Sequence, residues 1–248
     1  MSGHSKWASI KHKKAAIDAK RGQLFTKVIK ELTAAARSGG GNTDTNIRLR
    51  TAIAKAKESN MPSDNIEKAI MRGTGELPGI TYEEASYEGY GPAGIAIMLD
   101  VVTDNKNRTT AELRNLMSKK GANMAQAGAV SFLFQKKGYI VVEKDVVDED
   151  KLMNIVLEAG AEDMKTDDPK VYEVITQPQD FEAVKKAIEE KNIAMQSAET
   201  TMLASTTIKI TDKSAANTIL GLMDVLEEHE DVQHVYSNFD IPDELIEG

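Results

Sequence analysis

Cysteine is absent from the 248 residues, and aromatic residues make up only 5% of them, with a single tryptophan. Without cysteine the chain has no disulfide, no thiol nucleophile and no cysteine-ligated zinc site, which fits a reducing compartment. Long hydrophobic runs are missing as well. No run approaches the ~20 apolar residues of a membrane-spanning helix, and none follows the first lysines as in a secretory signal. We therefore expect a cytoplasmic protein that does not enter a membrane.

Motifs of catalysis are also scarce. Residues 89–94 match G-x-G-x-x-G, but Pro92 removes a backbone amide and a strand is predicted to follow, so we interpret the segment as a turn. His229 and His234 lie in an acidic segment at a spacing that fits no familiar metal site, and we interpret both as solvated. The sequence thus predicts a protein that is not an enzyme and has no cofactor and no metal.

Charge is distributed unevenly along the chain. The formal net charge is −8, yet residues 1–72 hold 15 Lys and Arg against six Asp and Glu, an excess of nine positive charges. The other residues hold 16 basic and 33 acidic side chains, a net charge of −17. Positive charge is densest at residues 3–22, where six basic residues face the single acid Asp18. This division predicts one end that meets a polyanion and a remainder that does not.

The basic end is the strongest functional signal. Lysine and arginine neutralise phosphates and release counterions, and a tryptophan offers a surface on which an unpaired base stacks. For Trp7, packing against the neighbouring helices is an equally supported interpretation. The residues that we expect to bind nucleic acid are Lys6, Trp7, Lys11, His12, Lys13, Lys14, Lys20, Arg21, Lys27 and Lys30.

Apolar periodicity predicts three helices after a basic arm of about 21 residues. The first runs over 23–37 and ends at the glycines of 39–41, and the second runs over 47–59. The third has Pro62 in its first turn and stops at Gly73. These helices form one small bundle, and a linker over 73–79 follows.

Strands and helices alternate after this linker. Strands are predicted at 85–89 and 95–102, a helix at 109–120 and a short strand at 130–134. The β-α-β-β-α-β order of a ferredoxin-like fold is then predicted over 139–142, 149–159, 164–166, 171–176, 180–190 and 199–203. A last strand, helix and strand, which we expect to complete the sheet begun at residue 85, are predicted at 207–210, 215–227 and 232–238.

The predicted fold class is therefore α+β, with three domains. Residues 1–77 form a basic helical domain, the three-helix bundle with its arm. Residues 78–134 and 205–248 form an α/β domain, and residues 135–204 form a second, ferredoxin-like α/β domain that is inserted into it. We expect a monomer.

Short motifs spread over most of the chain together resemble the YebC/PmpR family. They are Gly3-His-Ser-Lys-Trp7, Ile10-Lys-His-Lys-Lys14, Asp18 with Arg21-Gly22, Asn60-Met-Pro62 with Asn65-Ile-Glu67, the 89–94 segment, Asn107-Arg108-Thr109 and Gly128-Ala-Val-Ser-Phe132. The resemblance implies the same three domains and a non-enzymatic cytosolic regulator of gene expression. Its members carry two assignments. One is DNA-binding transcriptional regulation. The other is translational activation on the ribosome, including relief of stalling at proline-rich stretches and help to mitochondrial synthesis of cytochrome oxidase subunit I.

Two classes of function stay open at this point. The first is a regulator that binds nucleic acid, either DNA or ribosomal RNA, with the ribosome as a further partner. The family label favours DNA, whereas the lack of a clear helix-turn-helix, zinc-finger or basic-zipper sequence favours structured RNA. The second class is an acidic protein-interaction module, in which the arm only folds onto the helices. Nothing in the spacing of the carboxylates promotes an enzyme.

Overall fold

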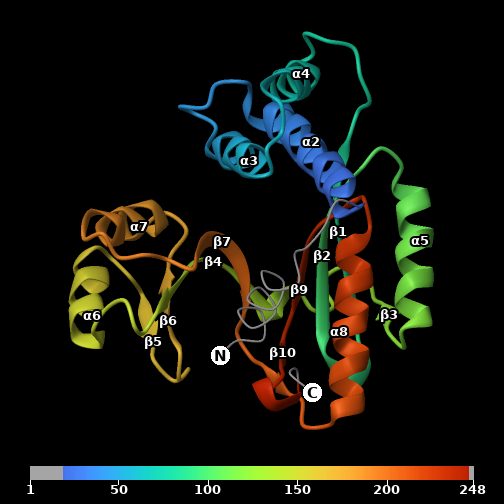
Figure 1. Cartoon of the computed structure of the whole chain (residues 1–248). Coiled ribbons are helices and arrows are strands. Elements are labelled where there is room, and N and C mark those ends of the chain that lie inside the picture. Colours follow the sequence, from blue (N-terminus) through green and yellow to red (C-terminus); the bar gives the residue numbers. More distant parts are fainter. Residues whose placement is uncertain (1–18, 246–248) are drawn as a thin grey trace. The chain divides into compact units, whose positions relative to one another are not determined.

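The computed structural model describes residues 19–245, which form two compact units (Figure 1). The smaller unit comprises residues 132–207, and the larger one contains the described residues on both sides of it, 19–131 and 208–245. The described chain is a mixture of helices and mainly antiparallel sheets, as the predicted fold class requires. The finer division into a separate helical domain over 1–77 stays a prediction.

Three helices open the larger unit, in the order predicted. They are α2 (Ala19–Gly39), α3 (Ile47–Glu58) and α4 (Ser63–Thr74). The Asn46 side chain accepts the N–H of Leu49 and so caps the start of α3, while Gly75, at φ +84°, ends α4 in the left-handed conformation. Gly73 permits close packing of α4 on α2, because a Cβ there would lie 2.5 Å from the Thr33 carbonyl oxygen. Helix α2 begins four residues earlier than predicted.

The main sheet of the larger unit has the strand order β3-β1-β2-β9. Its strands are β1 (Glu83–Tyr90), β2 (Ala96–Thr103), β3 (Asn123–Met124) and β9 (Val232–Ser237). Two helices pack on one face, α5 (Lys106–Lys119) and α8 (Lys213–Glu228), and they share a core with Ile97, Leu99 and Val101 of β2. Because β2 and β3 both pair antiparallel with β1, β2-α5-β3 is a split β-α-β element.

The C-terminal part of the chain completes this sheet only in part. Strand β9 pairs with β2, as predicted. The other predicted strand of this part, β8 (Ile208–Lys209), instead pairs with β10 (Phe239–Asp240) in a separate parallel sheet of two strands. A short 3₁₀ turn, Asp243–Leu245, follows β10.

The turn predicted at residues 89–94 is confirmed. It joins β1 to β2 through a 3₁₀ turn at Pro92–Gly94, and the Gly91 N–H donates to the Ile95 carbonyl. Ala93 and Gly94 both have positive φ, and a strand follows rather than a helix. No row of amides at a helix start is therefore available here for a dinucleotide phosphate.

The strand predicted at 130–134 is wrong. Residues Ser131–Leu133 form a 3₁₀ turn, and a strand begins only at Phe134. The reason is the buried carboxylate of Glu88, which accepts the backbone N–H groups of Gly128, Val130 and Ser131 at 2.6–2.9 Å. These amides are thereby withdrawn from any strand pairing.

The smaller unit has the ferredoxin-like order predicted for it. Its elements are β4 (Phe134–Glu143), α6 (Glu149–Glu158), β5 (Asp163–Lys165), β6 (Val171–Thr176), α7 (Phe181–Glu190) and β7 (Ser197–Ala204). All neighbours in the sheet order β5-β6-β4-β7 are antiparallel. Buried Leu152, Val156, Val184 and Ile188 on the two helices form a core with the sheet. Within residues 19–245, no helix has the length and apolar character needed to cross a membrane.

Candidate nucleic-acid interface

The structure describes the side chains of only two of the ten predicted nucleic-acid ligands. Lys20 and Arg21 lie in the first turn of α2, and only their backbone is described. Outside the described residues lie Lys6, Trp7, Lys11, His12, Lys13 and Lys14. The two described side chains, Lys27 and Lys30, both project from α2 toward the segment that joins α8 to β9.

Lys27 holds α2 against the end of α8. Its ammonium group donates to the carbonyl oxygen of Glu227 in the last turn of α8, and to that of Val232 in β9 at 2.7 Å. The final carbonyls of a helix carry partial negative charge, so a lysine at this point is favourable. The side chain therefore has a structural role in this conformation.

Lys30 is buried and bound to a buried carboxylate. Its Nζ lies 2.5 Å from Oδ1 of Asp231, and the two side chains are 6% and 0% exposed. The other carboxylate oxygen, Oδ2, accepts hydrogen bonds from Thr109 at 2.7 Å and Arg108 at 2.8 Å, both on α5. We call Lys30, Arg108, Thr109 and Asp231 the Asp231 cluster. It connects α2, α5 and the start of β9 through one carboxylate.

The Asp231 carboxylate is charged at neutral pH in spite of its burial. Burial alone would raise its pKa, but hydrogen bonds from Lys30, Thr109 and Arg108 outweigh this effect and lower the pKa to about 2. The hydrogen bond to Asp231 in turn raises the pKa of Arg108. Two cations share one carboxylate, so the cluster is an ion network that depends on Asp231.

Sequence reasoning did not find this cluster. Lys30 and Asp231 are 201 residues apart, and a buried ion pair has no periodic signal. One signal was available in the sequence, because Arg108 and Thr109 lie in Asn107-Arg108-Thr109, one of the short motifs that carry the family resemblance. For Lys27 and Lys30, phosphate binding stays a prediction, and the structure shows both ammonium groups bound by protein oxygen atoms.

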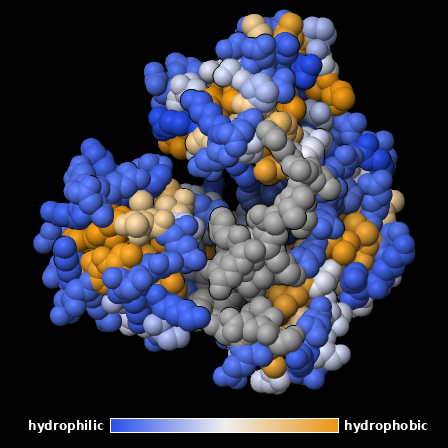
Figure 2. Space-filling view, in the orientation of Figure 1, coloured by the Kyte–Doolittle hydropathy of each residue, from blue (hydrophilic) through white to orange (hydrophobic). Residues whose placement is uncertain are grey.

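The helical region also exposes cations that the sequence analysis did not single out. Arg48 is partly enclosed, because Glu31 on α2 and Glu84 on β1 bind it at 2.7 and 2.8 Å. The exposed basic residues of this region are Arg37, Arg50, Lys55, Lys57, Lys68 and Arg72. Hydrophilic residues dominate the face drawn in Figure 2, with smaller apolar areas among them.

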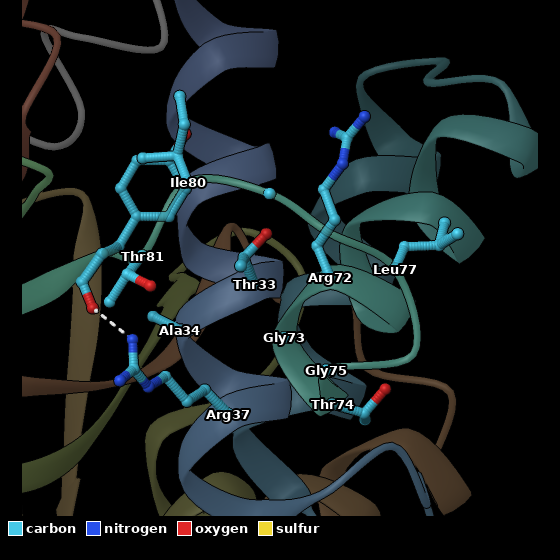
Figure 3. A pocket seen from close by; sticks show the side chains of 12 residues that line it. Thr33, Ala34, Arg37, Arg72, Gly73, Thr74, Gly75, Leu77, Ile80 and Thr81 are labelled. Carbon is cyan, nitrogen blue, oxygen red and sulfur yellow. Dashed lines mark hydrogen bonds between the residues drawn. The ribbon is translucent and has the colours of Figure 1, made fainter.

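A cavity of about 270 Å³ lies between α2, the end of α4 and the segment that leads to β1. Arg37 and Arg72 line it from the two helices, with Thr33 between them (Figure 3). Arg37 donates to the carbonyl oxygen of Tyr82, which also lines the cavity. Two arginines and one aromatic residue therefore line this cavity, with the guanidinium groups of Arg37 and Arg72 on opposite sides of it in Figure 3.

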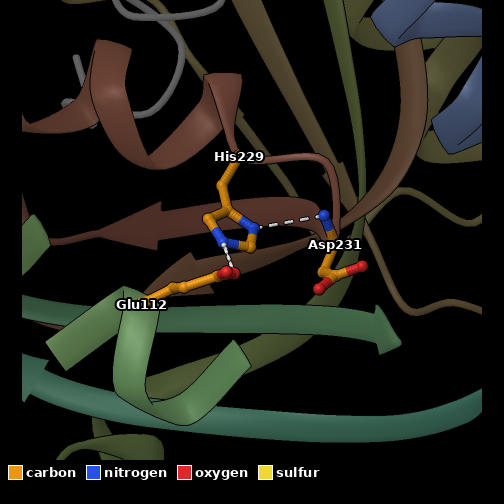
Figure 4. Close-up of side chains that lie close together, drawn as sticks. All are labelled: Glu112, His229 and Asp231. Atoms are coloured by element: carbon orange, nitrogen blue, oxygen red, sulfur yellow. Dashed lines mark hydrogen bonds and ion pairs between the residues drawn. The ribbon is translucent and has the colours of Figure 1, made fainter. Parts of the chain in front are cut away.

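A second group of polar side chains, Glu112, His229 and Asp231, has the composition of a metal site (Figure 4). The backbone N–H of Asp231 donates a hydrogen bond to Nδ1 of His229, so Nε2 is the ring nitrogen that donates a hydrogen bond to the Glu112 carboxylate, at 3.0 Å. Because Lys30 and Arg108 already neutralise Asp231, a metal cation would face two fixed positive charges. The arrangement does not fit a metal.

The prediction that both of these histidines are solvated is wrong for His229. Its side chain is only 9% exposed, because it packs at the end of α8 beside Glu112. His234, in contrast, is exposed and stacks on Tyr236 with ring centroids 5.8 Å apart.

Comparisons with known proteins cover nearly the whole chain. Residues 5–76 match the family described as the TACO1/YebC protein N-terminal domain, and residues 82–239 match the TACO1/YebC second and third domain. Relatives named "probable transcriptional regulatory protein" include one from Persephonella marina, 53% identical over 247 residues, and one from Dictyoglomus turgidum, 55% identical over 249. Both alignments span 100% of this chain and 99% of the relative.

A solved structure agrees with these sequence matches. The crystal structure of a conserved hypothetical protein from Aquifex aeolicus has a TM-score of 0.82 and 46% sequence identity, and the match covers 96% of this chain and 97% of that one. The family resemblance inferred from the short motifs is thus confirmed.

Proposed function

The chain belongs to the TACO1/YebC family, and from this premise we propose that it is a non-enzymatic regulator of gene expression that binds nucleic acid through its basic end. The observation that carries the proposal is the excess of nine positive charges in residues 1–72, against a net −17 in the remaining chain. A polyanion is attracted to the first part and repelled by the second.

The fixed position of α2 supports this proposal. Lys27 and the Asp231 cluster hold the middle of α2 against the α/β layer, so Lys20 and Arg21 in its first turn lie on an anchored helix. The basic arm that precedes α2 starts from this anchored point. Holding in place the residues that adjoin a ligand-binding segment lowers the ordering cost of binding.

The choice between DNA and RNA rests on two opposing observations. The relatives are named probable transcriptional regulatory proteins, and regulation of transcription favours DNA. Helix α4, which follows α3 after a four-residue connection as in a helix-turn-helix, exposes Asp64 and Glu67 in its first half. Carboxylates at the start of a recognition helix would repel the phosphates that flank a DNA groove, so α4 is unsuited to helix-turn-helix docking. This favours structured RNA such as ribosomal RNA, whose recognition needs no helix in a groove.

A full-length variant tests the role of the arm. Lys6, Lys11, Lys13 and Lys14 are changed together to Gln, and binding of duplex DNA and of ribosomal RNA is measured as a function of salt. If each lysine meets one phosphate, the slope of log K against log salt falls by about 3.6 for duplex DNA and about 2.8 for single strands. In parallel, crosslinking in cells identifies the attached nucleic acid.

The matched control removes the same charge elsewhere. It carries Gln at four exposed lysines of the smaller unit, Lys151, Lys165, Lys186 and Lys191. Equal losses in the two variants would show that only net charge matters and would contradict the proposal. If the wild-type chain bound neither DNA nor RNA at low salt, the proposal would be wrong, and the acidic protein-interaction module would take its place as the proposed function.

A further inference from the structure

The cavity beside α4 is formed by specific backbone features. Gly73 lets α4 pack closely on α2, and Gly75 turns the chain back in the left-handed conformation. Gly79 then passes against the Arg72 side chain, where a Cβ would lie 3.0 Å from Cγ and Cδ. The segment therefore runs along the aliphatic part of Arg72 and leaves about 270 Å³ open beside it.

The lining of the cavity combines positive charge with apolar surface. Arg37 uses one N–H group for the Tyr82 carbonyl, and a guanidinium group has five such donors. Arg72 is exposed, and Ile80 is 59% exposed at the same cavity. None of the described residues that line it is acidic. The complementary ligand carries negative charge beside a flat apolar group.

Size narrows the class of ligand further. Pockets for drug-sized ligands measure about 300–1,000 Å³, so a cavity of about 270 Å³ admits one small moiety and not a dinucleotide. A base in a duplex is paired and stacked on its neighbours and cannot enter alone. An unpaired base can enter, while a phosphate of the same nucleotide stays at the rim beside Arg72.

We propose that the cavity of Arg37, Arg72, Ile80 and Tyr82 binds one unpaired nucleotide, with a phosphate on the Arg72 guanidinium group and its base against Tyr82 and Ile80. The inference rests on the proposed nucleic-acid-binding function and gives it a preference for single-stranded segments. Arginine suits this site because its planar group donates in pairs to phosphate oxygens.

The test compares Arg72→Gln with Lys68→Gln in the full chain. Both residues are exposed on α4 about one turn apart and both changes remove one charge, but only Arg72 lines the cavity. The probes are a single-stranded RNA oligonucleotide and a DNA duplex, followed by fluorescence anisotropy at several salt concentrations. Arg72→Gln is expected to weaken RNA binding about tenfold and to lower its salt slope by about 0.7. On the DNA duplex, Arg72→Gln should lose as much affinity as Lys68→Gln does.

A second variant, Tyr82→Leu, keeps an apolar side chain but removes the stacking ring. We expect about a tenfold loss on the RNA oligonucleotide and no change in its salt slope. The cavity proposal is overturned if Arg72→Gln and Lys68→Gln behave alike on both probes, or if Tyr82→Leu binds RNA as the wild type does. In those cases the wild-type chain still binds nucleic acid, so the proposed function is not contradicted. Wild-type failure on both probes overturns both proposals.

Discussion

Replacing Asp231 by Asn should destabilise the larger unit by several kcal/mol. The change keeps the size of the side chain but removes the charge that Lys30 and Arg108 share. Lys30 is only 5% exposed and would be left as a buried cation without a carboxylate. Breaking a buried pair in this way costs about 3–5 kcal/mol.

Part of this cost depends on pH. The Asp231 pKa lies at about 2 instead of 3.8, and this difference corresponds to about 2.5 kcal/mol at about 1.4 kcal/mol per pKa unit. Because the pKa is lowered on folding, the contribution is complete above the unfolded value and is lost as pH falls through the folded one. The stability gap between wild type and variant should therefore narrow by about 2.5 kcal/mol between pH 6 and pH 1.

The assay is urea unfolding followed by circular dichroism, with hydrogen exchange of the α2 and β9 amides as the readout specific to the larger unit. Lys30→Met, which leaves Asp231 bound to Arg108 and Thr109, should cost less than Asp231→Asn. Asp145→Asn, at an exposed position in the smaller unit, should stay within about 0.5 kcal/mol of wild type. If Asp231→Asn lowers the free energy of unfolding by less than about 1 kcal/mol, or by an amount that does not change with pH, the reasoning is refuted.

Two further predictions concern packing and the loop before β4. Glu88→Gln puts an amide group toward three backbone N–H donors and should lower the free energy of unfolding by about 1–3 kcal/mol. Hydrogen exchange at residues 128–131 should become faster. Unchanged exchange at these residues would contradict the anchoring role of Glu88. Gly73→Ala places a Cβ 2.7 Å from that of Ala36 and should lower the melting temperature. Gly22→Ala should raise it slightly, because outside its own helix no atom of the described residues lies within 4 Å of the added Cβ. Similar melting shifts for the two glycine variants would show that α2 and α4 are not in tight contact.

The helices and the larger strands could be predicted because their signals are local. Apolar spacing along α3 gave its bounds to within one residue, and the strand Val171–Thr176 was predicted with the bounds that it has. The two-residue strand β3 has no such pattern and was missed, since it forms only where Gly89 lets it approach β1. The pattern of β8 predicted a strand but did not show its partner.

The candidate interface could be predicted in its charge but not in its geometry. Composition placed the positive charge in residues 1–72, yet it could not separate exposed Arg72 from buried Lys30. That difference depends on Asp231, 201 residues from Lys30, and on tertiary packing. The same holds for His229, whose burial follows from its contact with Glu112 on another helix.

The central claim, that the basic end carries the nucleic-acid contact, is tested most directly by hydrogen exchange of the full chain with and without saturating nucleic acid. The account predicts slower exchange in peptides of residues 1–77 and unchanged exchange throughout 132–207. Slower exchange confined to 132–207, with residues 1–77 unaffected, would contradict it.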